Sequence, residues 1–162
     1  MKQEDFKTLF DNHFTPLRNY IYYRSGNQEL ATDIAQESFM RIWEKQLTQP
    51  AKEQVGLLYK IAIDLFVTKN RHLKVVESFT MQEHNNDLAQ SPEEQLAYQE
   101  LKMRYESALL ELPESQRTVF LMSRMDELKY HEIADRLQLS VKSVEKKMTL
   151  ALKYLRQALG QS

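Results

Sequence analysis

The sequence predicts an all-α protein of two small helical domains joined by a polar linker. Apolar residues recur at helical spacings of three and four over most of the 162 residues. Only three glycines and four prolines are present, too few for the many turns of an all-β fold. A polar stretch without periodicity covers 76–92, and we therefore expect domains at 1–75 and 93–162.

The N-terminal domain contains amphipathic segments punctuated by proline and asparagine. Pro16 separates two of them, because proline breaks a helix interior but suits a first helical position. Asn27 is a suitable N-cap for a helix that ends near Gln46. Pro50 opens a further helix, which we expect to continue to about Lys74.

The C-terminal domain begins with a helix from about Glu93 to Glu111. Leu112 and Pro113 then interrupt the chain, and helices follow at 114–125 and 130–137. Ser140 caps a last amphipathic helix that ends near Leu159.

The last two helices have the spacing of a helix-turn-helix. Ala134 is small enough for close helix approach, and Val141 and Val144 should pack the last helix on the preceding one. The outward residues of the first turns are then the candidate DNA contacts: Lys142, Ser143, Lys146 and Lys147. The same pattern also fits a surface helix with solvated lysines.

The net charge of −1 conceals an uneven distribution. Residues 138–162 contain five bases and one acid, and residues 60–74 contain four bases and one acid. The acidic segment 76–114 lies between them. Two local basic surfaces are therefore compatible with nucleic-acid binding despite the balanced total.

Two motifs, in order, resemble those of one bacterial family. The segment 112–159 is similar to region 4 of sigma factors, through LP at 112–113, EIA at 132–134 and SVKSV at 140–144. The N-terminal half is similar to sigma region 2, through DIAQESF at 33–39, RIWE at 41–44 and LLYKIA at 57–62. Region 2, a linker and region 4 form the layout of extracytoplasmic-function (ECF) sigma factors.

This resemblance implies a promoter-specificity factor that is not an enzyme. Its C-terminal domain would be the winged-helix-like helix-turn-helix of region 4, reading the −35 element. Its N-terminal domain would read and melt the −10 element. The implied partners are core RNA polymerase (its β′ clamp helices and β flap), double- and single-stranded promoter DNA, and an anti-sigma factor. The resemblance also implies a cytoplasmic protein without membrane insertion.

The resemblance also implies site residues. Those that would bind polymerase are Asp33, Gln36, Glu37, Arg41 and Trp43. Those that would bind the −10 element are Lys60, Lys69, Asn70, Arg71 and Lys74.

Several residues depart from the family pattern. Asp64 lies where the family often has an amide, so an acid would face DNA. Glu127 and Gln138 lie at turns where glycine is common, and both would then need a positive φ.

Other chemistry finds little support in the sequence. With no cysteine, thiolate metal sites and disulfides are excluded, and the four histidines lack metal-ligand spacing. We expect no catalytic residue, cofactor or metal. Two alternatives to a working sigma factor remain: a degenerate sigma-like module that binds polymerase or a regulator, and a dimeric helix-turn-helix regulator.

Overall fold

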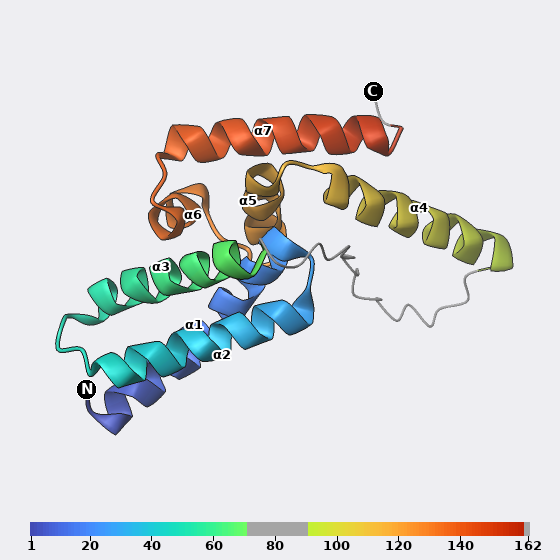
Figure 1. The fold of residues 1–162 in the computed structure, drawn as a ribbon. Helices are drawn as coiled ribbons and strands as arrows, with labels where there is room; N and C mark the ends of the chain where they lie inside the picture. The colour runs from blue at the N-terminus through green and yellow to red at the C-terminus, as the bar shows by residue number, and fades with distance from the viewer. Residues whose placement is uncertain (71–90, 161–162) are drawn as a thin grey trace.

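The computed structural model describes residues 1–70 and 91–160. Its first three helices, α1 (Gln3–Ser25), α2 (Gln28–Lys45) and α3 (Ala51–Asn70), pack against one another as one bundle (Figure 1). The core of this bundle is formed by Leu17, Ile21, Ile34, Phe39, Ile42 and Leu58, all at most 2% exposed. The all-α prediction is confirmed.

The predicted break at Pro16 is wrong, because α1 runs through it without interruption. Proline lacks the N–H that would bond the carbonyl four residues earlier, at a cost of about 3 kcal/mol. Leu9, Leu17 and Ile21 lie along one buried stripe on both sides of the proline. Burial of each contributes about 1.5–3 kcal/mol, so packing outweighs the defect.

Polar side chains cap the starts of two further helices. The Asn27 side chain accepts a hydrogen bond from the Leu30 N–H (3.0 Å) at the start of α2. Of the predicted linker 76–92, residues 76–90 lie outside the described residues, whereas Ser91 caps the next helix and Pro92 begins it. The first-turn proline needs no N–H partner there.

The C-terminal half contains four helices, and α5 lies at its centre. They are α4 (Pro92–Glu111), α5 (Glu114–Arg124), α6 (Tyr130–Leu137) and α7 (Val141–Ala158). The central helix α5 packs on α1, α6 and α7, so it joins the two halves, whereas α4 extends away from the body (Figure 1). No strand occurs within residues 1–70 and 91–160.

The helix-turn-helix forms as predicted except at one residue. Ala134 and Val144 are buried between α6 and α7, but Val141 is 41% exposed, so its predicted packing role is wrong. The buried stripe of α7 continues from Val144 through Met148, Ala151 and Leu155, each on successive turns. Val141 lies on the first turn, before this stripe begins.

Both predicted strained turns are confirmed. Glu127 has φ 55° and Gln138 has φ 56°, in the left-handed region that favours glycine. At the start of α6, where Lys129 has no hydroxyl to cap the helix, the Glu132 carboxylate accepts the Lys129 N–H (3.0 Å). This acidic residue supplies the backward half of a capping box.

Candidate nucleic-acid interface

The α7 helix presents a lysine stripe on the side opposite its buried stripe. Lys142 and Lys146 are exposed and four residues apart, so they lie one above the other. Thr149 and Lys153 extend the same line, at intervals of three and four. Lys153 was not among the predicted DNA contacts, although its spacing of seven from Lys146 was a signal for it. We call Lys142, Lys146 and Lys153 the α7 stripe.

The other two predicted contacts of this helix lie on its flank. Ser143 and Lys147 are half-buried, and the Ser143 N–H donates to the Ser140 hydroxyl oxygen (3.1 Å). Glu145 is exposed on the other flank of the stripe. Of the four predicted DNA contacts of α7, Lys142 and Lys146 therefore point outward, whereas Ser143 and Lys147 lie on the flank.

The predicted −10 residues do not share one face of α3. Lys60 and Lys69 are nine residues apart, which places them on opposite sides of the helix. Lys60 is exposed one turn before the exposed Asp64. Lys69 instead forms an ion pair with Glu37 of α2 (3.3 Å). Asn70 ends α3, whereas Arg71 and Lys74 lie outside the described residues.

The predicted polymerase residues of α2 do form a surface. Asp33, Gln36 and Arg41 are exposed, and Glu37 is half-exposed and bonded to Arg41 (3.2 Å). The helical repeat places Met40 among them, with 62% of its surface exposed. Met40 was missed because it reads as an apolar core residue in the sequence.

Trp43 lies at the edge of this surface rather than at its centre. Its ring packs edge-on against Phe6 of α1, with 5.0 Å between the ring centroids, and 38% of the residue is exposed. A shallow groove beside it is lined by Gln3, Phe6, Met40, Trp43 and Glu44. Apolar atoms ringed by charged groups are typical of protein-binding surfaces.

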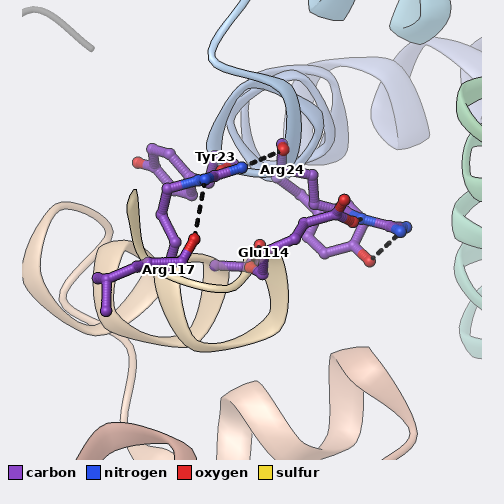
Figure 2. Close-up of polar contacts among 7 residues, drawn as sticks. Tyr23, Arg24, Glu114 and Arg117 are labelled. Carbon is purple, nitrogen blue, oxygen red and sulfur yellow. Dashed lines mark hydrogen bonds and ion pairs between the residues drawn. The ribbon is translucent and has the colours of Figure 1, made fainter. Parts of the chain in front are cut away.

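A cluster of polar side chains joins the two halves of the chain. Figure 2 shows Arg117 of α5 reaching the end of α1, where it donates to the carbonyls of Tyr23 (2.8 Å) and Arg24. Its other amino group reaches the carbonyls of Leu109 and Leu112 at the end of α4 (3.5 and 3.3 Å). Carbonyls in the last turn of a helix lack intrahelical donors and carry partial negative charge. The single guanidinium of Arg117 therefore supplies hydrogen-bond donors to the carbonyls at the ends of both α1 and α4.

Two further contacts cross the same interface. Arg24 pairs with Glu114 of α5, and its guanidinium lies 4.7 Å from the ring centre of Phe66 of α3. Asp126, after α5, accepts hydrogen bonds from the Tyr23 hydroxyl (2.6 Å) and the Asn19 amide (3.3 Å). We call Tyr23, Arg24, Glu114, Arg117 and Asp126 the interdomain cluster.

Burial shifts the titration of groups along this interface. Desolvation raises the pKa of the Asp126 carboxyl, and the bonds from Tyr23 and Asn19 partly oppose that shift. Burial raises the pKa of Tyr59 to about 12, with Arg136 of α6 opposing it. Burial and then the charge of Arg136 lower the pKa of His13. The charge of Arg136 therefore acts on groups of both α1 and α3.

Neither a membrane-spanning helix nor a metal-binding cluster occurs in the described residues. Within 1–70 and 91–160, no helix is long and apolar enough to cross a membrane. The same residues hold no group of three His, Cys, Asp or Glu side chains arranged to bind a metal ion.

Comparison with known proteins gives one consistent result. The family description "Sigma-70, region 4" matches residues 102–155. The ferric citrate uptake sigma factor FecI of Escherichia coli is 28% identical over 92% of this chain and 87% of its own length. The ECF RNA polymerase sigma factor SigW of Bacillus subtilis is 27% identical over 97% of this chain and 90% of its own.

A solved structure has the same fold. The sigma factor RpoE of Bartonella quintana, in complex with the anti-sigma factor NepR, superposes with a TM-score of 0.62 at 16% identity. The superposition covers 97% of this chain and 98% of that one, so the likeness includes both halves. The region 4 match and two relatives aligned over most of their length therefore make this chain similar to the ECF-type sigma factors of the sigma-70 family.

Proposed function

We propose that this protein binds core RNA polymerase and directs transcription initiation at specific promoters. In this proposal α7 reads the −35 element, and the N-terminal bundle reads and melts the −10 element. The observation that supports it most is the exposed α7 stripe on a helix-turn-helix, in a chain similar to ECF sigma factors. The structure leaves this stripe uncovered by the rest of the described chain.

The α7 stripe has the chemistry that a major-groove helix needs. Lys142 lies on the first turn, where a recognition helix meets base edges, and lysine can donate to guanine O6 and N7. Lys146 and Lys153 lie further along and are placed to meet phosphate oxygens. The stripe is short, so it supports weak binding that a larger partner strengthens.

The surface of α2 supports the polymerase contact. The exposed Met40 can be buried against a partner protein. The polar and charged side chains around it, Asp33, Gln36 and Arg41, can orient that partner. In this proposal the β′ clamp helices of polymerase bind this surface, and the β flap binds the C-terminal domain. Met40→Asp should weaken core binding at least tenfold, because it places a carboxylate at the centre of the contact.

An anti-sigma factor is the proposed regulatory partner. Support comes from the RpoE structure, which holds the anti-sigma factor NepR. The two exposed surfaces of this chain, on α2 and α7, are those that such a partner would need to cover.

Reconstitution with cognate core enzyme tests the proposal. Purified protein and core polymerase should give transcripts from promoters that core alone does not use. The same protein should bind promoter DNA poorly without core, because each of its DNA surfaces is small. Absence of both core binding and promoter-directed transcripts would refute the proposal.

A second candidate is a sigma-like module that binds polymerase without opening DNA. Asp64 beside Lys60, and the pairing of Lys69 with Glu37, leave α3 with little free positive charge in the described residues. Permanganate footprinting separates the two, since reactive thymines at −10 show an open bubble. Tight binding to a palindrome without polymerase would instead indicate a dimeric regulator.

A further inference from the structure

We propose that Glu145 is a specificity-determining residue of α7, whose carboxylate accepts a hydrogen bond from the N4 amino group of a cytosine in the −35 element. This inference rests on the proposed function, since it concerns the DNA site that α7 would read. It adds to the α7 stripe a group of opposite charge, whose partner in DNA is a base rather than a phosphate.

Glu145 lies on the flank of the α7 stripe, close to the start of the helix. It follows Lys142 by three residues, so it is about 60° around the helix axis from that lysine. The residue is exposed, and its backbone carbonyl accepts the hydroxyl of Thr149 one turn later (2.9 Å). A helix that lies in the major groove with its first turns therefore brings this carboxylate to the DNA together with Lys142.

The Glu145 carboxylate has no partner in the described chain. Within 1–70 and 91–160, none of the ion pairs and side-chain hydrogen bonds involves it. Lys142 precedes it at a spacing that allows an ion pair on a helix, yet the two side chains are not paired. Glu132, by contrast, uses its carboxylate to accept the Lys129 N–H at the start of α6. The Glu145 carboxylate is therefore available to a ligand.

An ionised carboxylate only accepts hydrogen bonds, and this property selects among the bases. In the major groove guanine presents two acceptors, and thymine presents an acceptor and a methyl group. Adenine presents a donor beside an acceptor, whereas cytosine presents the N4 donor alone. Phosphate oxygens carry the same charge as the carboxylate and repel it. Cytosine is therefore the DNA group that matches Glu145.

Lys142 supplies the other half of the same reading. Residues three apart on a helix have Cβ atoms about 5–6 Å apart, so Lys142 and Glu145 reach neighbouring points of the groove. The lysine can donate to guanine O6 and N7 while the glutamate accepts from cytosine N4. Together the two side chains match one G·C base pair, or a guanine and a cytosine in adjacent pairs.

Val141 adds an apolar group on the same side of the helix as Glu145. It is 41% exposed on the first turn, and the two side chains, four residues apart, lie one above the other. An apolar side chain in the major groove can contact the methyl group of thymine. Four residues rise about 6 Å, close to the rise of two base pairs. A thymine is therefore expected within about two base pairs of the cytosine.

Selection from a promoter library tests this inference in the holoenzyme. The full-length chain and cognate core polymerase are mixed with promoters randomised across the −35 element, and the bound DNA is sequenced. The wild-type protein should favour cytosine at one position by about fivefold to tenfold over the other bases. A library that yields preferences at several positions, but for cytosine at none, would overturn the inference.

Two substitutions of Glu145 give opposite expectations at this position. Glu145→Ala should remove the cytosine preference, at the same base pair as the preference lost in Lys142→Ala or at the pair next to it. Glu145→Gln should move the preference from cytosine to adenine, because an amide can bond adenine N6 and N7 together. Retention of the cytosine preference in Glu145→Ala would overturn the inference.

A glutamate that only repels the DNA backbone would behave differently. Glu145→Ala would then raise the affinity for all promoters by one factor and leave the base frequencies unchanged, and this result would overturn the inference. Glu100→Gln is the control for net charge, because Glu100 is exposed on α4, which extends away from the body. It should change no base frequency, and an effect equal to that of Glu145→Gln would overturn the assignment. Circular dichroism checks that all variants stay helical.

Val141→Ala tests the neighbouring apolar contact. It should reduce the thymine preference by about twofold to fourfold and leave the cytosine preference in place. Loss of both preferences together would overturn the separate roles of the two residues.

Failure of the proposed function gives a different result in the same experiment. If the protein does not bind core, or if no −35 position shows any preference, the reading by α7 fails and the inference on Glu145 fails with it. If preferences are present but identical in the wild type and Glu145→Ala, the proposed function stands and only the role of Glu145 is overturned.

Discussion

Replacing Arg117 by methionine removes the guanidinium that joins the ends of α1 and α4. The side chain is 8% exposed, and its two shortest bonds go to the carbonyls of Tyr23 and Arg24. Hydrogen bonds from a charged group contribute about 1.5 kcal/mol or more each, so their loss predicts about 3 kcal/mol. Methionine avoids the cost of burying a charge, which reduces the expected net loss to about 2 kcal/mol.

The N-terminal half offers a local probe for this effect. Trp43 is the only tryptophan, and it lies on α2 against Phe6. Its fluorescence therefore follows unfolding of the bundle that α1 belongs to, although Arg117 lies in the other half. With a slope of about 2 kcal/mol per molar urea, the expected loss moves the midpoint down by about 1 M.

A matched arginine provides the control. Arg104 also donates to the last turn of a helix, at the Ala158 carbonyl of α7 (3.2 Å), but it is exposed and makes this bond within the C-terminal half. Arg104→Met should leave the Trp43 midpoint in place. A shift of less than about 0.2 M for Arg117→Met, or an equal shift for both variants, would refute the reasoning.

Three further results are expected. Glu127→Gly should raise the free energy of unfolding by about 0.5–1 kcal/mol, because glycine tolerates the positive φ of this turn; a lower stability would contradict the strain. Burial, and then the charge of Arg136, lower the pKa of His13 in the folded protein. The unfolded chain therefore takes up more protons below pH 6.5, and stability should fall as the pH drops from about 7.5 to about 5.5. Urea unfolding should show that His13→Asn removes this part of the pH dependence, and identical profiles would exclude it. Replacing Lys146 and Lys147 by alanine should reduce the salt slope of −35 binding by about two units if both contact phosphates, and an unchanged slope would exclude such contacts.

Local signals in the sequence were sufficient to place two helix starts. Asn27 and Ser140 mark helix starts through side chains that cap the backbone within three residues, so no distant contact is needed to place them. The capping predictions hold because each depends on neighbours in the chain. The positive φ of Glu127 and Gln138 was instead expected from the resemblance, because glycine is common at both turns in the family.

Predictions that depended on distant packing were less successful. Proline at position 16 signals a break, yet the buried stripe of α1 against α2 and α3 overrides it. The basic residues of 60–74 suggested one surface, but Lys69 turns to Glu37 on another helix. The contact between Arg117 and Tyr23 joins residues 94 positions apart, and no periodicity can reveal it.

The carboxylate of Glu37 serves two cations at once, Arg41 on its own helix and Lys69 on α3. One belongs to the predicted polymerase surface and the other to the predicted promoter surface. If a polymerase group bound Glu37, the Lys69 ammonium would lose its partner and be available to DNA. Because linkage is reciprocal, DNA that bound Lys69 would raise the affinity of Glu37 for polymerase by the same factor. All three side chains are partly exposed, so any such coupling would amount to about 1 kcal/mol at most.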